Sequence, residues 1–456
     1  MPPGRLTPML RALRQGASGH RHLLTGSGAL VVTAGVQAIS GALFWLLSAR
    51  SDSQTDVGHA TALYTSVLFV AFLAGLGQPV AVARYAAGRT RDDHVLYAWA
   101  TAATAAAGSL AGLAYLYVVS PAAIDELRDW DPTLGPALFV FFVVGSGLSL
   151  LVDVRLMTQR RWGLVILRAV VVAVLRFPLL ALPVEEHRSL WLFVAATVPT
   201  ALSGLVVTGL LPLVTGDRHR FAPLPSSTRA MVRYSGVNWL STLAYQAPTF
   251  AMPVIVLVNV DADVNASFYV AWGIVGLAGY VPMAIGQALL AEGGRDGAQV
   301  RSQVRLAVVV AGGLMVVGTL LATALRQLIV TLYGDDYQAA ADILPPLVAA
   351  SIPWAVTSVY LTEARIRHFS GATIAITGTL TVSILGAALV LVPEHGLDGA
   401  AWAFLGGNLL AAIVAFGTHW VGRQAYDEPA ATGSHPGAMG GDELDADDVL
   451  GVAPLT

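Results

Sequence analysis

The sequence predicts an all-α integral membrane protein with twelve transmembrane helices. Of its 456 residues, 55% are hydrophobic and 12% are charged, whereas a soluble domain usually carries about 25% charged residues. The mean hydropathy is +0.66, and the apolar residues gather in long segments separated by short polar stretches. This composition excludes a soluble globular protein, a disordered chain and a nucleic-acid-binding protein, so no nucleic-acid partner is expected.

Twelve segments are long enough to cross a bilayer, which takes about 20 predominantly apolar residues. They comprise residues 24–48, 60–83, 95–119, 134–157, 163–183, 190–214, 234–260, 266–291, 306–325, 343–362, 369–392 and 399–421. Ten carry no charge; the fourth contains Asp153 and Arg155, and the fifth contains Arg168 and Arg176. The first segment is too long for the apolar region of a cleaved signal peptide, so it is expected to remain as a span.

The placement of arginine predicts the orientation of these spans. All 26 basic residues are arginine. With the N-terminus in the cytoplasm, 20 of them fall on the cytoplasmic side and four on the outer side, which is the asymmetry that the positive-inside rule describes. Both termini are therefore expected in the cytoplasm. Trp45 and Trp191 lie near segment ends, where tryptophan belts contact the membrane interface.

The chain divides into two sets of six spans. A basic N-terminus (1–23) precedes the first set (24–215), a polar cytoplasmic linker (216–233) separates it from the second set (234–421), and an acidic tail rich in Gly, Ala and Pro (422–456) is expected to be disordered. The segments VGHATALY (57–64) and VNASFY (264–269) start the second span of each set at an offset of 207 residues, which is a weak sign of an internal repeat.

Several kinds of chemistry have no signature in this sequence. There is no cysteine and no Gly-rich phosphate loop, and the ten histidines show no metal-ligand spacing. We therefore expect no cofactor, no bound metal and no enzymatic activity. Asp261 and Asp263, like Asp129 and Asp131, form D-x-D patterns on the predicted outer side; such pairs can hold a metal in a glycosyltransferase, but a polar turn between spans is the favoured interpretation.

Ionisable residues inside a span are candidate functional groups because they are costly to insert. Arg168 lies a few residues from the cytoplasmic end of the fifth segment and could reach the interface. Arg176 lies about 20 Å along that helix from its cytoplasmic end, so it either faces a cavity or reaches the outer interface by a longer path. Arginine suits phosphate because its planar guanidinium forms two parallel hydrogen bonds and stays charged.

The seventh segment is the richest in uncharged polar residues. Asn238, Tyr245 and Gln246 lie on it, followed by Pro248 and Pro253, which weaken the helix and predict a bend. These three polar residues either line a pathway or form hydrogen bonds between helices, which contribute about 1 kcal/mol each.

Three stretches of this sequence resemble those of the polysaccharide flippases of the MOP (multidrug/oligosaccharidyl-lipid/polysaccharide) exporter superfamily, in particular its O-antigen flippase-like branch. GLGQPVAVARY (75–85) is similar to the end of the family's second helix, YGDDYQAAADIL (333–344) resembles the start of its tenth helix, and GLDGAAWA (396–403) resembles the start of its twelfth. The resemblance covers residues 20–422.

This resemblance implies two six-helix lobes around a central cavity in the cell membrane of a bacterium. The implied cargo is a lipid-linked (polyprenyl-diphosphate) oligosaccharide or polysaccharide precursor, carried by alternating access. Implied partners are membrane lipids, a polysaccharide polymerase and glycosyltransferases. Cationic cavity residues of the family bind the diphosphate, but the first and seventh segments contain no internal arginine here. The candidate residues for binding the diphosphate are therefore Arg168 and Arg176, together with Arg50 and Arg84 at the ends of their helices.

Three other functions remain open at this stage. A multidrug/cation antiporter of the same superfamily needs a carboxylate inside the membrane, and segments one, two, seven and eight contain none. A membrane-embedded glycan polymerase or glycosyltransferase needs functional carboxylates in large outer loops. A scaffold that gathers biosynthetic enzymes needs no polar cavity.

Overall fold

A computed structural model describes residues 29, 32–79, 82, 91–118, 127–215, 222, 228–293, 300–367 and 369–427. Within these ranges all the regular secondary structure is helical. The predicted basic N-terminus, most of the linker, most of the acidic tail and Arg84 lie outside the described residues.

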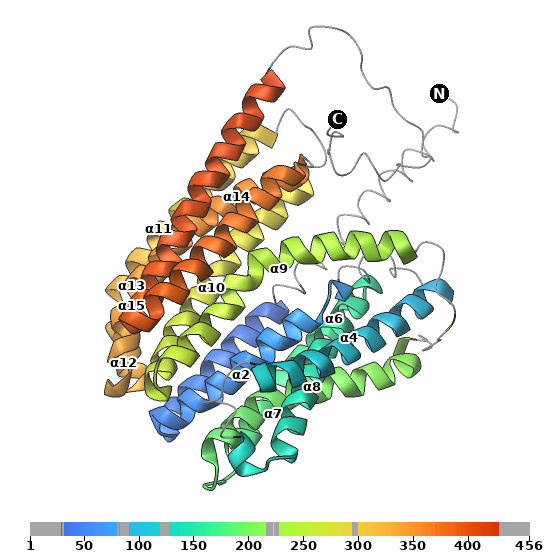
Figure 1. The fold of residues 1–456 in the computed structure, drawn as a ribbon, viewed down its shortest axis with the longest axis vertical. Helices are drawn as coiled ribbons and strands as arrows, with labels where there is room; N and C mark the ends of the chain where they lie inside the picture. Colours follow the sequence, from blue (N-terminus) through green and yellow to red (C-terminus); the bar gives the residue numbers. More distant parts are fainter. Residues whose placement is uncertain are drawn as a thin grey trace, which may run out of the picture.

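The first six long helices form one group, here called the N lobe. It contains the helix Val32–Ser51, α2 (Gln54–Ala74), α4 (Arg91–Val118), α6 (Leu134–Thr158), α7 (Trp162–Leu180) and α8 (Arg188–Thr215). In Figure 1 these helices, coloured blue to green, lie together and pack as a bundle.

The remaining helices form the C lobe, coloured yellow-green to red in Figure 1. It contains α9 (Thr228–Asn259), α10 (Ala262–Gly293), α11 (Val300–Ala324), α12 (Gln327–Tyr333), the 3-10 turn η1 (Asp335–Tyr337), α13 (Gln338–Ala349), α14 (Ser351–Ile366) and α15 (Ser370–Asp427). Two helices extend past the predicted limits of the lobe: α9 starts six residues before residue 234, and α15 continues beyond residue 421.

The structure corrects the limits of the second predicted span, 60–83. The helix α2 starts at Gln54 because the hydroxyl of Ser53 accepts a hydrogen bond of 3.1 Å from the backbone NH of Asp56 and caps the first turn. It ends at Ala74, where Leu76 and Gly77 take positive φ angles of 44° and 71° that a helix cannot continue through. The resemblance segment 75–85 therefore begins with a turn.

Two glycines interrupt the second half of the C lobe. Gly334 has φ 115° and ψ 165°, and it separates α12 from η1. Gly396 has φ 55° and ψ −127° and kinks α15, so that this element consists of two passes in sequence. Both conformations exclude ordinary side chains, which explains why glycine stands at these two positions of the segments that carry the family resemblance.

Ten helices in the described part of the chain are long and apolar enough to cross a membrane. One of them, Gly371–Val421, contains the kink at Gly396 and so accounts for two passes. The helix α4 has 28 residues and covers most of the third predicted span, although it is not among the ten. With α4 included, the twelve predicted spans are all present as helices. The tenth of these spans is made of α13 and α14 together.

Small residues allow the helices of each lobe to approach closely, as is usual between membrane helices. A Cβ atom on Gly204 of α8 would lie 2.1 Å from the carbonyl oxygen of Gly145 of α6. In the C lobe, a Cβ atom on Gly407 would lie 2.4 Å from the side chain of Ile384 across the kink of α15. Packing of this kind fixes each lobe as a unit.

The two lobes meet along α2 and α10, and we call this contact the seam. Polar side chains make contacts across the seam at one end of these helices. The arginine distribution predicts that this end faces the outside. From this region the lobes diverge toward the end of α15 and the start of α4 (Figure 1). The arrangement is that of two bundles joined at the predicted outer end.

Candidate functional site

The guanidinium of Arg176 is positioned by α7 between α8 and the helix Val32–Ser51. Its Nη2 donates a hydrogen bond of 3.3 Å to the hydroxyl of Thr200. Its Nη1 lies 4.0 Å from the place a Cβ atom of Gly41 would take, so the absent side chain of Gly41 leaves room for the guanidinium. Its Nε is buried without a hydrogen-bond partner, and no carboxylate of the described residues lies within ion-pair distance.

Three aromatic rings lie at the seam close to Arg176, and we call them the seam aromatic cluster. Trp45 and Tyr64 come from the N lobe, and Tyr269 comes from α10 of the C lobe. The ring centroid of Trp45 lies 5.8 Å from that of Tyr64 and 5.3 Å from that of Tyr269, and the two tyrosine rings are 6.4 Å apart. Arg176 is close enough to Tyr269 for an electrostatic interaction across the seam.

The position of Trp45 corrects the sequence interpretation, which placed it in an interfacial belt. Its side chain is 7% exposed and packs against the other lobe. A tryptophan near the end of an apolar segment has the same local pattern in both situations, so only the contact with Tyr269 distinguishes them.

Arg168 is held inside the N lobe by several partners. Its Nε donates to Asp153 of α6 at 2.9 Å, and its Nη2 forms an ion pair with the same carboxylate. Its Nη1 donates to the hydroxyls of Ser149 (2.7 Å) and Ser203 (3.3 Å). The side chain is 8% exposed. This buried network joins α6, α7 and α8, and it also neutralises the charge that the sequence assigned to binding.

Arg50 and Gln54 cross the seam at the predicted outer end, and we call them the outer latch. Arg50 donates to the backbone carbonyls of Thr331 and Leu332, in the last turn of α12. Gln54 donates to the hydroxyl of Ser267 at 3.0 Å and to the carbonyl of Asp336 at 2.9 Å. The cation of Arg50 is placed at a helix C-terminus, where the helix dipole favours it.

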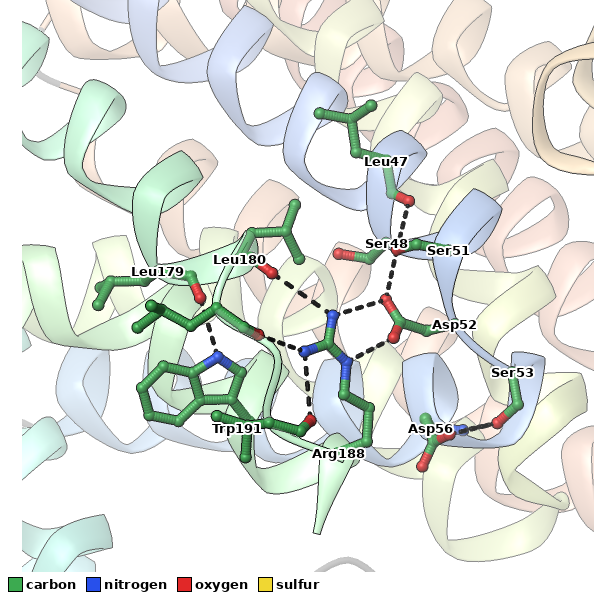
Figure 2. Close-up of polar contacts among 12 residues, drawn as sticks. Leu47, Ser48, Ser51, Asp52, Ser53, Asp56, Leu179, Leu180, Arg188 and Trp191 are labelled. Atoms are coloured by element: carbon green, nitrogen blue, oxygen red, sulfur yellow. Dashed lines mark hydrogen bonds and ion pairs between the residues drawn. The ribbon is translucent and has the colours of Figure 1, made fainter. Parts of the chain in front are cut away.

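Between the two latch residues, Asp52 forms a contact within the N lobe. Figure 2 shows its carboxylate facing the guanidinium of Arg188, with Nε donating at 2.5 Å and Nη2 at 3.4 Å. Arg188 also donates to the carbonyl of Leu180, the last residue of α7, at 3.4 Å, and to that of Leu182, just beyond the helix, at 3.2 Å. The junction between the helix Val32–Ser51 and α2 is therefore fixed to its own lobe at Asp52 and to the other lobe at Arg50 and Gln54.

The polar residues of the predicted pathway helix lie on α9, on the C-lobe side. The hydroxyl of Tyr245 accepts a hydrogen bond of 3.0 Å from the indole NH of Trp354 on α14. Gln246 is partly buried on the same helix. Asn238 is placed on α9 only by its backbone. Tyr245 is thus bonded between helices, and the described contacts do not bring it to Arg176.

A carboxylate that sequence reasoning missed is buried at the end of α14. Glu363 has a side chain that is 5% exposed; it forms an ion pair of 2.9 Å with Arg367 and a contact of 2.5 Å with Nδ1 of His419 on α15. The predicted span ended at residue 362, one position before Glu363. His419 lies 56 positions away along the chain, so no pattern in the neighbouring sequence could predict that the two side chains meet.

The D-x-D pattern of Asp261 and Asp263 lies at the turn between α9 and α10. Both side chains are exposed, and Asp263 is in the first turn of α10, where a carboxylate is favoured by the helix dipole. No group of three or more His, Cys, Asp or Glu residues capable of holding a metal ion occurs among the described residues.

Comparison with solved structures places this architecture in a known class. The fold is similar to that of a multidrug resistance MATE family transporter of the MOP superfamily in its inward-facing conformation, with a TM-score of 0.64, 16% identity, and coverage of 88% of this chain and 99% of that one. A MATE protein in complex with MaL6 gives a TM-score of 0.58 and 16% identity over 90% of this chain and 97% of that one.

An outward-facing structure of a MATE family transporter of the MOP superfamily gives a TM-score of 0.55 and 14% identity over 90% of this chain and 96% of that one. Neither a family model nor a curated protein matches the sequence. The likeness establishes the fold: this chain is an all-helical, multi-pass membrane protein with the two-lobe architecture of these transporters.

Proposed function

We propose that this protein is an alternating-access exporter whose cargo is an amphiphile with an anionic head group, namely a lipid-linked (polyprenyl-diphosphate) oligosaccharide or polysaccharide precursor. The observation that carries the proposal is Arg176, a cation at the seam without a carboxylate partner among the described residues and with a buried, unbonded Nε. A cation whose Nε is buried is costly unless that group is paired, so an anionic partner that arrives with the cargo would satisfy it.

The chemistry of the guanidinium fits a diphosphate. Nε and one terminal nitrogen of arginine point the same way and can donate two parallel hydrogen bonds to one phosphate. Thr200 occupies only Nη2 of Arg176. The neighbouring ring of Tyr64, which is only partly buried, offers an apolar face and a hydroxyl to the sugar or linker next to the phosphate. In this proposal Arg168 does not bind the diphosphate, because Asp153 already neutralises its charge; it holds α6, α7 and α8 together.

The arrangement of the lobes supports alternating access. The outer latch joins the lobes at the predicted outer end, while the lobes diverge toward the predicted inner end. The likeness is also greater to the inward-facing than to the outward-facing transporter. In the proposed cycle, cargo enters from the cytoplasm, binds Arg176, and leaves after the contacts of Arg50 and Gln54 break.

Replacement of Arg176 tests the proposal. We expect Arg176→Ala to fold and reach the membrane at a normal level but to flip an undecaprenyl-diphosphate oligosaccharide in proteoliposomes about tenfold or more slowly, because a hydrogen bond to a charged group contributes about 1.5–3 kcal/mol. Arg176→Lys should rescue only part of the rate, since lysine keeps the charge and loses the paired geometry. Arg305→Ala, at an exposed position on α11, is the matched control. Full flipping by Arg176→Ala would contradict the proposal.

A second candidate function, a cation-coupled multidrug exporter, is favoured by one observation. Glu363 is a buried carboxylate in contact with a histidine, and such a group could exchange a proton. Arg367 stabilises its charged form, which weakens this alternative. If the alternative is correct, Glu363→Gln should abolish export of a cationic dye driven by a pH gradient, whereas Glu394→Gln, at an exposed site, should not. Unchanged dye export in Glu363→Gln would count against it.

A further inference from the structure

A long groove runs between α7 and α8 on the N lobe, separate from the seam. It has a volume of about 590 Å³. Its lining includes Leu164, Leu167, Val171 and Leu175 of α7, and α8 contributes Leu202, Val206 and Leu210, among others. Pro178 and Pro199 lie at the same end of the groove, where α7 ends.

The groove is almost entirely apolar, and most of its rim is exposed. Val171 is 44% exposed and Val206 is 51% exposed. The polar side chains in the lining are Arg168 and Ser203. Arg168 is bonded to Asp153 and Ser203, so the lining presents no uncompensated charge. Because the groove opens on the apolar outer surface of two predicted membrane spans, its lining matches a hydrocarbon chain.

The length of the groove distinguishes an ordinary acyl chain from a longer polyprenyl chain. Along α7 it extends from Leu164 to Leu179, which is about 22 Å at 1.5 Å per residue. The hydrocarbon core of a bilayer is about 30 Å thick, so one leaflet provides about 15 Å. A chain that fills the groove from one surface therefore passes the midplane. An ordinary acyl chain ends near the midplane, whereas a polyprenyl chain is long enough.

We propose that the α7/α8 groove binds the polyprenyl chain of the cargo while its head group moves through the seam. This inference rests on the proposed function. The helix α7 would serve both parts of one molecule: Leu175 and Leu179 face the groove, and Arg176, between them in sequence, extends past Thr200 toward Gly41 at the seam side. Binding the chain on the same helix would hold the lipid beside the lobe that carries the cation.

Cross-linking from within the groove tests this assignment. The photoreactive amino acid p-benzoylphenylalanine is placed at Val171 or Val206 in the full chain, reconstituted in phosphatidylglycerol vesicles with or without decaprenyl phosphate. The matched control position is Leu320 on α11, which is 65% exposed and lies in another predicted span. After irradiation, mass spectrometry identifies each adduct. We expect decaprenyl phosphate adducts at both groove positions at about ten times the level at Leu320 or more.

A second experiment measures the binding of decaprenyl phosphate after large side chains are introduced into the groove. Val171→Trp combined with Val206→Trp should reduce binding of decaprenyl phosphate by about tenfold, since each buried methylene contributes to affinity, whereas Val309→Trp combined with Leu320→Trp on α11 should not. Equal labelling at Leu320, or adducts of phosphatidylglycerol alone at the groove positions, would overturn the proposal.

Groove labelling and flipping measured together in the Arg176→Ala variant separate this proposal from the proposed function. In Arg176→Ala, groove labelling is expected to persist while flipping slows about tenfold or more. Groove labelling together with normal flipping in Arg176→Ala would contradict the head-group role and leave the chain site standing. Loss of flipping without any decaprenyl adduct at Val171 or Val206 would contradict the chain site alone.

Discussion

The side-chain amide of Asn265 donates a hydrogen bond of 3.2 Å to the backbone carbonyl of Gly58, and these two residues, 207 positions apart, occupy corresponding places in the two halves of the sequence. Both lie near the start of the second helix of their lobe, α2 and α10. The weak echo between residues 57–64 and 264–269 therefore coincides with a physical contact between the echoing segments. Equivalent helices of the two lobes form the seam.

Gly58 allows this contact, and its replacement should disrupt it. A Cβ atom there would lie 1.7 Å from the carbonyl oxygen of Ala262, so Gly58→Ala must separate α2 from α10. We expect a loss of about 1–3 kcal/mol of stability, as for an overpacked core, seen as a lower melting temperature in detergent. Gly273→Ala on α10, where nothing lies within 4 Å of the new Cβ, is the control and should be neutral or stabilising. An unchanged melting temperature for Gly58→Ala would contradict the closeness of the seam.

The outer latch should control the balance between the two access states. Removing the bonds of Arg50 and Gln54 with the double alanine variant should favour the outward-open state, because each bond contributes about 0.5–1.5 kcal/mol to the closed one. The chain has no cysteine, so a single Thr61→Cys reports directly without touching the latch. This threonine is 0% exposed and faces Asn265 across the seam. An impermeant maleimide applied from outside should label it about tenfold faster in the latch variant.

Arg326→Ala, which removes an arginine at the start of α12, is the control for this experiment and should leave the labelling rate unchanged. If the latch variant is labelled no faster than the control, these bonds do not hold the outer end closed.

The ion pair of Asp52 with Arg188 should stabilise the N lobe without affecting access. Their side chains are 5% and 19% exposed, so Arg188→Ala leaves a nearly buried carboxylate without its partner. We expect a loss of about 1–3 kcal/mol, measured by thermal unfolding. The double variant Asp52→Asn, Arg188→Gln should recover part of this loss, because the orphaned charge is gone. If the loss in the double variant equals the sum of the losses in Asp52→Asn and Arg188→Gln alone, the pair is not coupled.

The contrast between Arg168 and Arg176 gives a fourth prediction. Arg168→Ala leaves Asp153 buried and unpaired, so it should lower abundance and thermal stability, by about 3–5 kcal/mol for a buried pair. Arg168→Ala combined with Asp153→Ala should be more stable than the single variant. Arg176→Ala should show neither effect. If Arg168→Ala is as stable as the unmodified protein and only slows flipping, then Arg168 acts in binding.

Local patterns predicted the helices well and their partners poorly. The apolar segments identified all twelve passes, because the free energy of transferring a span into a membrane depends mainly on its own residues. The limits of α2 and α14 were wrong because capping by Ser53, the turn at Gly77 and the buried pairing of Glu363 are not hydrophobic signals. The depth of Arg176 in its helix left open whether it faces a cavity, and the structure adds its position at the seam beside Tyr269.

By itself, the sequence determined the number of passes, the division into two sets of six, the charge asymmetry and the presence of two arginines within one span. Each of these depends on composition summed over neighbouring residues. Only the tertiary structure decided that Arg168 pairs with Asp153, 15 positions away, and that Arg50 reaches Leu332, 282 positions away. It also left Arg176 without a carboxylate among the described residues. A charge in a membrane protein takes its role from the group placed opposite it, and helix packing brings that group there from a distant part of the chain.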